Sequence, residues 1–344
     1  PQYQKNQSWV YSSDRCPLHQ FSEEAFCTRG MQCGKHMLLV GDSTVSRFGV
    51  ALRRLVSAKE RLSHCLTDNF CVEGHQNPES ASTCQITGHV ERIQGYELCD
   101  KFCPPGKPVH INYVRHDYLT HIHGDKNYWS AICEQWKNIA HRADYVLLSV
   151  GPHVHSMLTY PFGRHPPPDF NETAFFEQEA ADTTALLASI LKPNATLIYR
   201  TGAVGVQNYS RDCAARPLDT IPVVASMYSW DKIPLLNAAY IRHLQGGLGL
   251  GLGQRANNSN SGSGNASTGS GGTGPGTGTG AAEQGRSVLV MDTTTLMSKI
   301  YGCRDDYMHF LITAPDTPVL LEWLILYNLL LEHNRQRDST AATH

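Results

Sequence analysis

The chain has 344 residues, of which 41% are hydrophobic and 17% are charged, and its formal net charge is −2. This length and apolar content suffice for one large α/β domain with a substantial core. The charge gives no support for a nucleic-acid partner because the sequence has no basic tract. The longest apolar run, at residues 319–331, is too short and too polar to span a bilayer.

Short apolar runs alternate with segments of helical apolar spacing along most of the chain. The runs predict strands at residues 36–40, 109–114, 145–150, 196–200 and 287–291. The other segments predict helices at residues 45–56, 128–140, 171–191, 235–244 and 318–333. Strands that alternate with helices indicate an α/β fold with a doubly wound, mostly parallel sheet in three layers.

Two segments depart from this alternation. Residues 1–35 contain several cysteines and are expected to form a lead-in that packs on the main domain at 36–344. Residues 246–286 are rich in Gly, Ser, Thr and Asn, so they bury too little apolar surface to offset the entropy of ordering. We therefore expect a disordered insert within the main domain.

The cysteines favour disulfides over a metal site. Seven of the 11 cysteines fall between Cys16 and Cys99, without the second Cys-x-x-Cys or the His pair of a zinc site. The odd count leaves at least one free thiol, for which Cys213 and Cys303 are candidates. His121 and His123 alternate as strand residues would, but a third ligand is not near, so no metal or cofactor is expected.

The sequence also indicates a secretory location. Six glycosylation sequons, against roughly two expected by chance, begin at Asn6, Asn171, Asn194, Asn208, Asn257 and Asn265. Together with the cysteines they predict the lumen of the secretory pathway or the cell exterior. The chain starts at Pro1, which predicts a preceding signal peptide or signal anchor.

A first candidate for chemistry is Gly41-Asp42-Ser43, which lies between a predicted strand and a predicted helix. This order places Ser43 at the carboxyl end of the sheet and at a helix N-terminus, where free N–H groups stabilise an oxyanion. Arg47, four residues on, shares a helix face with Ser43. The alternative is that Asp42 or Ser43 is only a helix cap.

A second candidate is Asp306-x-x-His309. A serine hydroxyl needs a base to take its proton, and that base is usually a histidine oriented by a carboxylate. The three-residue spacing lets Asp306 reach Nδ1 of His309 and leaves Nε2 free to face Ser43. Asp305 is a second candidate for the orienting carboxylate. The alternative is that Asp306 caps a turn and His309 is a packed core histidine.

Other strand ends carry further candidate residues. His153 follows the predicted strand 145–150, and Arg200 with Thr201 ends the predicted strand 196–200. Because the carboxyl ends of parallel strands share one sheet edge, these residues are expected to converge with Ser43.

The two segments resemble the first and last blocks of the SGNH (GDSL-type) hydrolase superfamily. Further stretches resemble its PC-esterase and trichome-birefringence-like branch, the polysaccharide O-acetyltransferases of plants, algae and fungi. They are Cys16-Pro17-Leu18-His19-x-Phe21, Arg200-Thr201-x-x-x-Gly205, Ile233-Pro234-Leu235-Leu236-Asn237 and the apolar helix after Asp306-x-x-His309. The resemblance implies a flavodoxin-like fold and a catalytic Ser43, Asp306 and His309.

The chain also departs from the branch. Tyr307 stands where the family usually has a cysteine, and Val206 stands where its Gly-His motif has the histidine. The family's third block, Gly-x-Asn-Asp, corresponds here to Gly151-Pro152-His153, so the resemblance implies that His153 replaces the Asn as an oxyanion or substrate donor. Asp42, Arg47, Gly151, His153 and Arg200 are together the candidates for binding the oxyanion or the substrate.

Three functions follow as expectations. The first is a luminal, Golgi-type O-acyltransferase that moves an acetyl group from an acyl donor to a polysaccharide or glycan. The second is an acetylesterase with the same catalytic groups, in which water is the acceptor. The third, suggested by Tyr307 and Val206, is a catalytically inactive glycan-binding domain. A membrane partner is expected only through an N-terminal anchor.

Overall fold

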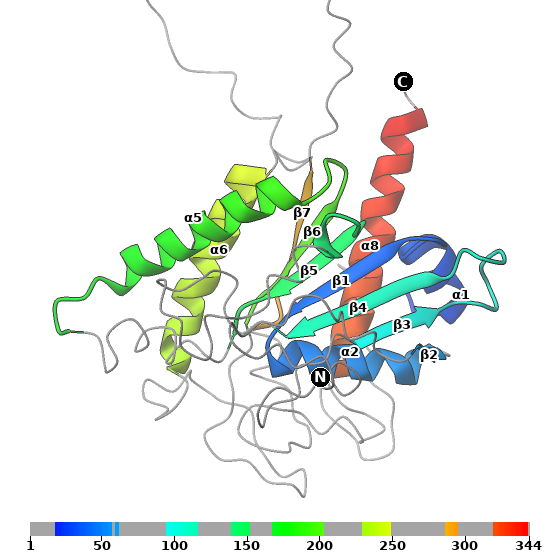
Figure 1. Ribbon diagram of the computed structural model, residues 1–344, viewed down its shortest axis with the longest axis horizontal. Helices are drawn as coiled ribbons and strands as arrows, with labels where there is room; N and C mark the ends of the chain where they lie inside the picture. Colours follow the sequence, from blue (N-terminus) through cyan, green and yellow to red (C-terminus); the bar gives the residue numbers. More distant parts are fainter. Residues whose placement is uncertain are drawn as a thin grey trace, which may run out of the picture.

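The structure is a computed structural model, and it describes residues 18–56, 59–61, 94–115, 139–151, 167–202, 229–248, 286–294 and 319–342. In these ranges seven strands form one mixed sheet in the order β2-β3-β4-β1-β5-β6-β7 (Figure 1). The strands are β1 (His36–Gly41), β2 (Lys59–Arg61), β3 (Gln94–Leu98), β4 (Val109–Arg115), β5 (Tyr145–Ser149), β6 (Thr196–Arg200) and β7 (Ser287–Met291). Strands β4, β1, β5, β6 and β7 are parallel, and β2 and β3 extend the sheet with antiparallel pairings.

Helices cover both faces of the sheet (Figure 1). The longer ones are α2 (Ser43–Leu55), α5 (Glu172–Ile190), α6 (Ile233–Leu248) and α8 (Val319–Ala342). Shorter turns are α1 (Glu23–Ala25), the π-helical turn η1 (Phe26–Gly30) and the 3-10 turn η4 (Trp230–Lys232). Helices α5 and α6 pack on one face, and α2 and α8 pack on the other.

The strand sequences explain why both faces are covered. Successive side chains of a strand point to opposite faces. In β1, Leu38 and Val40 pack toward α5 and α6, whereas Met37 and Leu39 pack toward α2 and α8. All five residues of β5 and of β6 are buried. Strands that are buried on both faces in this way fit only a sheet with two helical layers.

The predicted α/β fold with a mostly parallel sheet is confirmed. The strands predicted at 196–200 and 287–291 match β6 and β7, and the other three predicted strands end within one residue of β1, β4 and β5. The sequence did not predict β2 and β3, which are short and carry charged residues at the antiparallel side of the sheet. The helix predicted at 128–140 lies mostly outside the described residues.

Two predicted helix ends were wrong. Helix α8 continues to Ala342, because exposed side-chain pairs such as Arg335 with Glu332 support turns that carry no apolar pattern. Helix α6 continues to Leu248, so the predicted insert does not begin at Gly246. Gly247 lies against α5, where a Cβ would come 2.6 Å from Cγ2 of Thr184. The rest of that insert, 249–285, falls outside the described residues.

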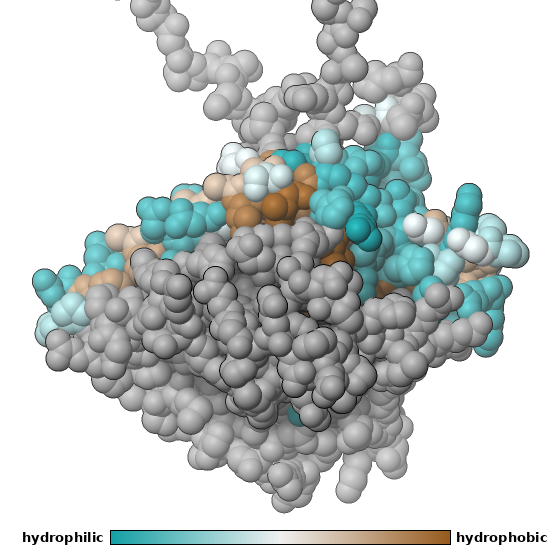
Figure 2. Space-filling view, in the orientation of Figure 1, coloured by the Kyte–Doolittle hydropathy of each residue, from teal (hydrophilic) through white to brown (hydrophobic). Residues whose placement is uncertain are grey.

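The edge strand β7 is covered less completely than the central strands. Its residues Ser287 to Val290 are half-buried, and only Met291 is fully buried. Figure 2 shows an apolar area where the ends of α5, α6 and β7 meet, in a described surface that is otherwise largely hydrophilic. No helix in the described ranges is both long enough and apolar enough to cross a membrane.

Two disulfides tie the N-terminal segment to the connection between β3 and β4. Cys27 bonds to Cys99, and Cys33 bonds to Cys103. The predicted disulfides near the N-terminus are thus confirmed for these four cysteines, and they indicate an oxidising compartment. The other seven cysteines, including the free-thiol candidates Cys213 and Cys303, lie outside the described residues, and the division at residue 35 stays a prediction.

Aromatic and amide contacts also hold this segment on α8. Phe26 meets Trp323 edge-on, with ring centroids 6.2 Å apart, and Phe21 meets Tyr327 at 5.3 Å. Asn334 donates hydrogen bonds to the carbonyls of Arg29 and Gly30. These carbonyls end the π-helical turn and would otherwise lack a helical partner.

The two disulfides differ in burial, and this predicts a difference in stability. The bridges span 72 and 70 residues, so each has a similar chain-entropy effect of at most about 4 kcal/mol. Cys27 and Cys99 are fully buried, whereas Cys33 and Cys103 are half-buried. We expect Cys27→Ala/Cys99→Ala to lose about 1 kcal/mol more than Cys33→Ala/Cys103→Ala, because it also leaves a cavity. Urea unfolding measures both, and an equal or smaller loss for the buried pair would contradict the prediction.

A buried histidine predicts how stability depends on pH. Burial lowers the pKa of His333 to about 4, and its Nε2 lies 3.1 Å from Oγ1 of Thr196. Below about pH 6.5 the unfolded chain binds a proton at this histidine that the folded chain does not bind until about pH 4, so stability falls as pH decreases through this range. His36, whose pKa burial also lowers, contributes in the same direction.

We therefore expect the unfolding free energy to decrease less in His333→Gln than in the wild type when the pH is lowered from 7 to 5. The glutamine keeps a polar partner for Thr196. His141→Gln, at an exposed position, is the control and should follow the wild type. Urea titrations at both pH values measure the difference, and identical pH dependence in His333→Gln and wild type would show that this histidine is not responsible.

Candidate functional site

Ser43 begins helix α2 immediately after the turn that ends β1. Gly41 is required in this turn, because a Cβ there would lie 2.5 Å from Cγ2 of Val45 and 2.7 Å from the carbonyl oxygen of Ser149. Asp42 is the N-cap, and its Oδ1 accepts a hydrogen bond of 2.7 Å from the backbone N–H of Thr44. The tight turn therefore puts half-buried Ser43 in the first turn of a 13-residue helix.

This turn lies where the order of the strands in the sheet reverses. Strand β1 pairs with β4 on one side and with β5 on the other, so the chain order of the strands reverses between β1 and β5. Open α/β sheets bind ligands outside the carboxyl ends of the strands at such a reversal. Ser43 and Gly151 both follow strands that end there.

Glycines let the strand ends approach closely at this edge. A Cβ on Gly151 would lie 2.7 Å from Oδ2 of Asp42. A Cβ on Gly202 would lie 2.5 Å from the carbonyl oxygen of Val150 and 3.0 Å from Cα of Gly151. The ends of β1, β5 and β6 therefore meet through backbone and one carboxylate, without intervening side chains from these glycines.

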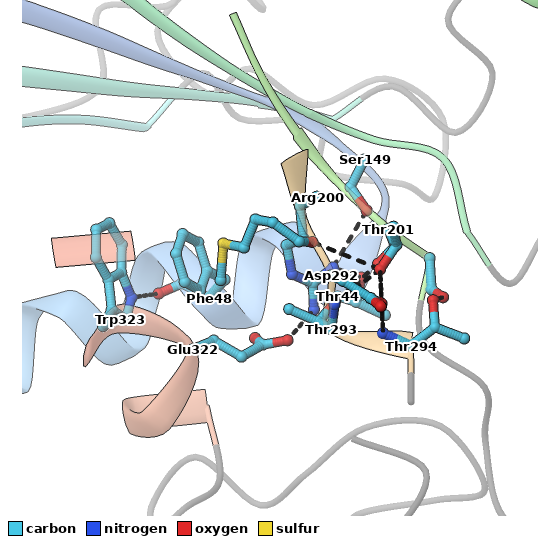
Figure 3. A network of polar contacts seen from close by, with 12 residues as sticks. Thr44, Phe48, Ser149, Arg200, Thr201, Asp292, Thr293, Thr294, Glu322 and Trp323 are labelled. Atoms are coloured by element: carbon cyan, nitrogen blue, oxygen red, sulfur yellow. Dashed lines mark hydrogen bonds and ion pairs between the residues drawn. The ribbon is translucent and has the colours of Figure 1, made fainter. Parts of the chain in front are cut away.

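Arg200 ends β6 and connects this edge to the helices on one face of the sheet (Figure 3). Its Nη1 donates to Oγ1 of Thr44 at 3.3 Å and to Oγ of Ser149 at 3.2 Å. Its Nη2 donates to Oε1 of Glu322 at 2.7 Å. The Arg200 side chain is 3% exposed, and its guanidinium carbon lies 5.9 Å from the ring centroid of Phe48.

A second polar network fixes the loops that follow β6 and β7. Oγ1 of Thr201 accepts hydrogen bonds from the backbone N–H groups of Thr293 and Thr294, and it donates to Oδ1 of Asp292. Asn237 of α6 accepts through Oδ1 from the N–H of Gly202. These contacts hold the carboxyl ends of the two strands together (Figure 3).

Two buried polar side-chain atoms stand out in the described part of the chain because they have no hydrogen-bond partner. They are Oδ2 of Asp42 and Nε of Arg200. Buried polar groups are rarely left unpaired, and exceptions gather at functional sites or beside bound water. Both atoms belong to residues of this edge, next to the first turn of α2.

The predicted site residues divide into two groups. The structure brings Asp42, Ser43, Gly151 and Arg200 to one edge, and it places half-buried Arg47 one turn further along α2. Asp306, His309 and His153 lie outside the described residues. Within the described ranges, His, Cys, Asp and Glu form no group of three that would hold a metal ion.

Sequence reasoning missed Glu322 and the segment Asp292-Thr293-Thr294. Glu322 is 1% exposed although it is ionisable, and it lies in the first turn of α8. A single acid inside an apolar helical stretch was a usable signal for a buried ion pair. The polar run after β7 was a second signal, because it begins where a parallel strand ends.

Comparison with known proteins does not assign this arrangement to a family. No protein-family model matches the chain, and no curated protein matches its sequence at a significant level.

The contact between Gly151 and Asp42 predicts a cost for any side chain at position 151. We expect Gly151→Ala to lower the unfolding free energy by about 1–3 kcal/mol, because the Cβ would displace the buried Asp42 carboxylate or the end of β5. Gly246→Ala in α6 is the control, since a Cβ there meets nothing within 4 Å. It should raise stability by up to about 1 kcal/mol. Urea unfolding distinguishes them, and wild-type stability of Gly151→Ala would refute the expected clash.

Proposed function

We propose that this chain is a serine-dependent O-acyltransferase of the SGNH type that transfers an acyl group, in the first place acetyl, to a polysaccharide or glycan. The observation that carries the proposal is the position of Ser43. It begins a helix after a buried parallel strand, at the edge where the order of strands reverses. A nucleophile there has helix N–H groups beside it, which suits a reaction that develops negative charge on oxygen.

The topology supports the same class. If the parallel strands β1, β4, β5, β6 and β7 are numbered in chain order, their order across the sheet is 2-1-3-4-5. This is the flavodoxin-like, doubly wound order, and ligands of such sheets bind where the first and third strands diverge. Asp42 and Ser43 follow the first of these strands, and Gly151 follows the third.

In the proposed reaction, Oγ of Ser43 attacks the carbonyl carbon of the acyl donor and gives its proton to His309. The tetrahedral intermediate expels the donor's leaving group, which takes that proton, and an acyl-Ser43 ester remains. A sugar hydroxyl then loses its proton to His309 and attacks the ester carbon, and the proton returns to Ser43 as the acylated sugar leaves. Asp306 keeps the imidazole in the required tautomer. The backbone N–H of Ser43 binds the oxyanion, and Asp42 holds the turn in place because it accepts hydrogen bonds from the N–H groups of Thr44 and Val45.

The compartment is also part of the proposal. The disulfides indicate oxidising surroundings, and the six sequons found in the sequence fit the lumen of the secretory pathway, as in the Golgi, or the exterior. Sugar acceptors are abundant there. This location agrees with a glycan substrate and an acyl donor supplied in the same compartment.

Replacement of Ser43 tests the proposal directly. We expect Ser43→Ala to lose covalent labelling by a fluorophosphonate probe and to reduce acetyl-ester turnover by at least about a thousandfold, because the nucleophile is removed. Ser189→Ala is the control, since this exposed serine lies on α5 and donates to the carbonyl of Leu186 within the same helix. A wild-type chain that is folded but is not labelled at Ser43 would rule out the serine mechanism and favour a glycan-binding domain.

The acceptor is tested with a labelled acetyl donor, with and without an oligosaccharide. Faster acetyl transfer to the sugar than to water supports the transferase. Release of acetate at a rate that the oligosaccharide does not change would instead identify an acetylesterase.

A further inference from the structure

Glu322 is a buried acid that the proposed reaction does not use. It lies in the first turn of α8, is 1% exposed, and accepts a hydrogen bond of 2.7 Å from Nη2 of Arg200. Burial raises the pKa of Glu322, and the nearby guanidinium of Arg200 opposes this effect. A charge in such a position needs a reason, because desolvation costs several kcal/mol per ion.

Docking of α8 on α2 is not a sufficient reason. The rings of Phe48 and Trp323 are stacked, with centroids 4.0 Å apart, and Nε1 of Trp323 donates to the carbonyl of Phe48 at 2.6 Å. These contacts already join the two helices through apolar area and a hydrogen bond (Figure 3). Buried ion pairs are often replaceable by apolar residues without loss of stability, so the pair does not follow from packing alone.

The pair does determine where the guanidinium points. With Nη2 held by Glu322, Nη1 reaches Thr44 and Ser149 on two other elements. Arg200 thereby connects β6, α8, β5 and α2 beneath the carboxyl edge.

Thr44 is the residue through which this connection reaches the nucleophile. Its backbone N–H is bound by Oδ1 of Asp42, and its hydroxyl is bound by Arg200. Thr44 directly follows Ser43, so these two bonds fix the backbone on which the Ser43 side chain and the first N–H groups of α2 are mounted. Small displacements of such groups are costly, since a 1 Å error in position reduces rates by roughly a hundredfold.

Helix α8 also lies close in sequence to the proposed base. Helix α8 begins at Val319, ten residues after His309, the proposed base. Glu322 therefore anchors the first turn of α8, the helix that follows His309 in the chain. Arg200 connects Glu322 to Thr44 on α2, the helix that carries Ser43.

We propose that Glu322 is a positioning residue for Ser43, acting through Arg200 and the hydroxyl of Thr44. It does not touch the substrate. This inference rests on the proposed function for its effect on rate, whereas its effect on the first turn of α2 can be measured without any reaction.

The test uses the full chain with Glu322→Gln, Thr44→Val and the double variant. Glu332→Gln is the matched control, because Glu332 is on the same helix and pairs with Arg335 in an exposed ion pair. Fluorophosphonate labelling of Ser43 and turnover of p-nitrophenyl acetate are measured for each. We expect each single variant to lower the labelling rate and kcat roughly ten- to a hundredfold with KM unchanged, and the double variant to be no slower than the slower single variant.

Folded Glu322→Gln with wild-type labelling and kcat would overturn the inference, as would single effects that multiply in the double variant. If Glu322→Gln does not fold, Thr44→Val decides, because it leaves the Arg200–Glu322 pair intact. A wild-type labelling rate in Thr44→Val would then overturn the inference.

Hydrogen exchange separates this inference from the proposed function. If the wild type neither labels nor turns over, the proposed function fails, but exchange of the peptide covering residues 41–48 still tests the positioning. Faster exchange there in Glu322→Gln than in Glu332→Gln, with α5 unchanged, supports it. Equal exchange in the two variants would overturn it.

Discussion

The guanidinium of Arg200 is the constraint on which the carboxyl edge of this sheet depends. It is buried, and its partners come from three other elements: a hydroxyl on α2, a hydroxyl on β5 and a carboxylate on α8. A buried charge that loses its partner typically costs about 3–5 kcal/mol, so these elements have one favourable arrangement around it. Apolar packing alone allows more freedom, because dispersion contacts have little directionality.

Close backbone approach is the second feature of this edge. Gly41, Gly151 and Gly202 lie at the ends of three neighbouring strands, and a Cβ at any of them would meet another atom at 2.7 Å or less. The absence of side chains at these positions brings the start of α2 against the end of β5. It also leaves one oxygen of Asp42 without a partner among the described residues, in a place where a ligand or a water molecule would supply a donor.

The opposite edge of the sheet is stabilised in a different way. Asp144, which precedes β5, accepts hydrogen bonds from Lys35, from Lys192 and from the backbone N–H of His36. The two disulfides fasten the N-terminal segment to the connection that leads into β4. These contacts secure the amino ends of the strands, whereas the carboxyl ends carry the buried ion pair of Arg200 and Glu322 and the two unpaired polar atoms.

The sequence by itself determined the alternation of elements and the location of Ser43 at a strand end. Apolar runs and helical spacing are local properties. They predicted both bounds of β6 and of β7 correctly, and they placed Ser43 at the N-terminus of a helix. The tertiary structure alone decided which strands are neighbours, that Arg200 faces Glu322 across 122 residues, and that Gly151 lies against Asp42. Those contacts join residues far apart in the chain, so no local periodicity encodes them. They follow from how two helical layers close over one sheet.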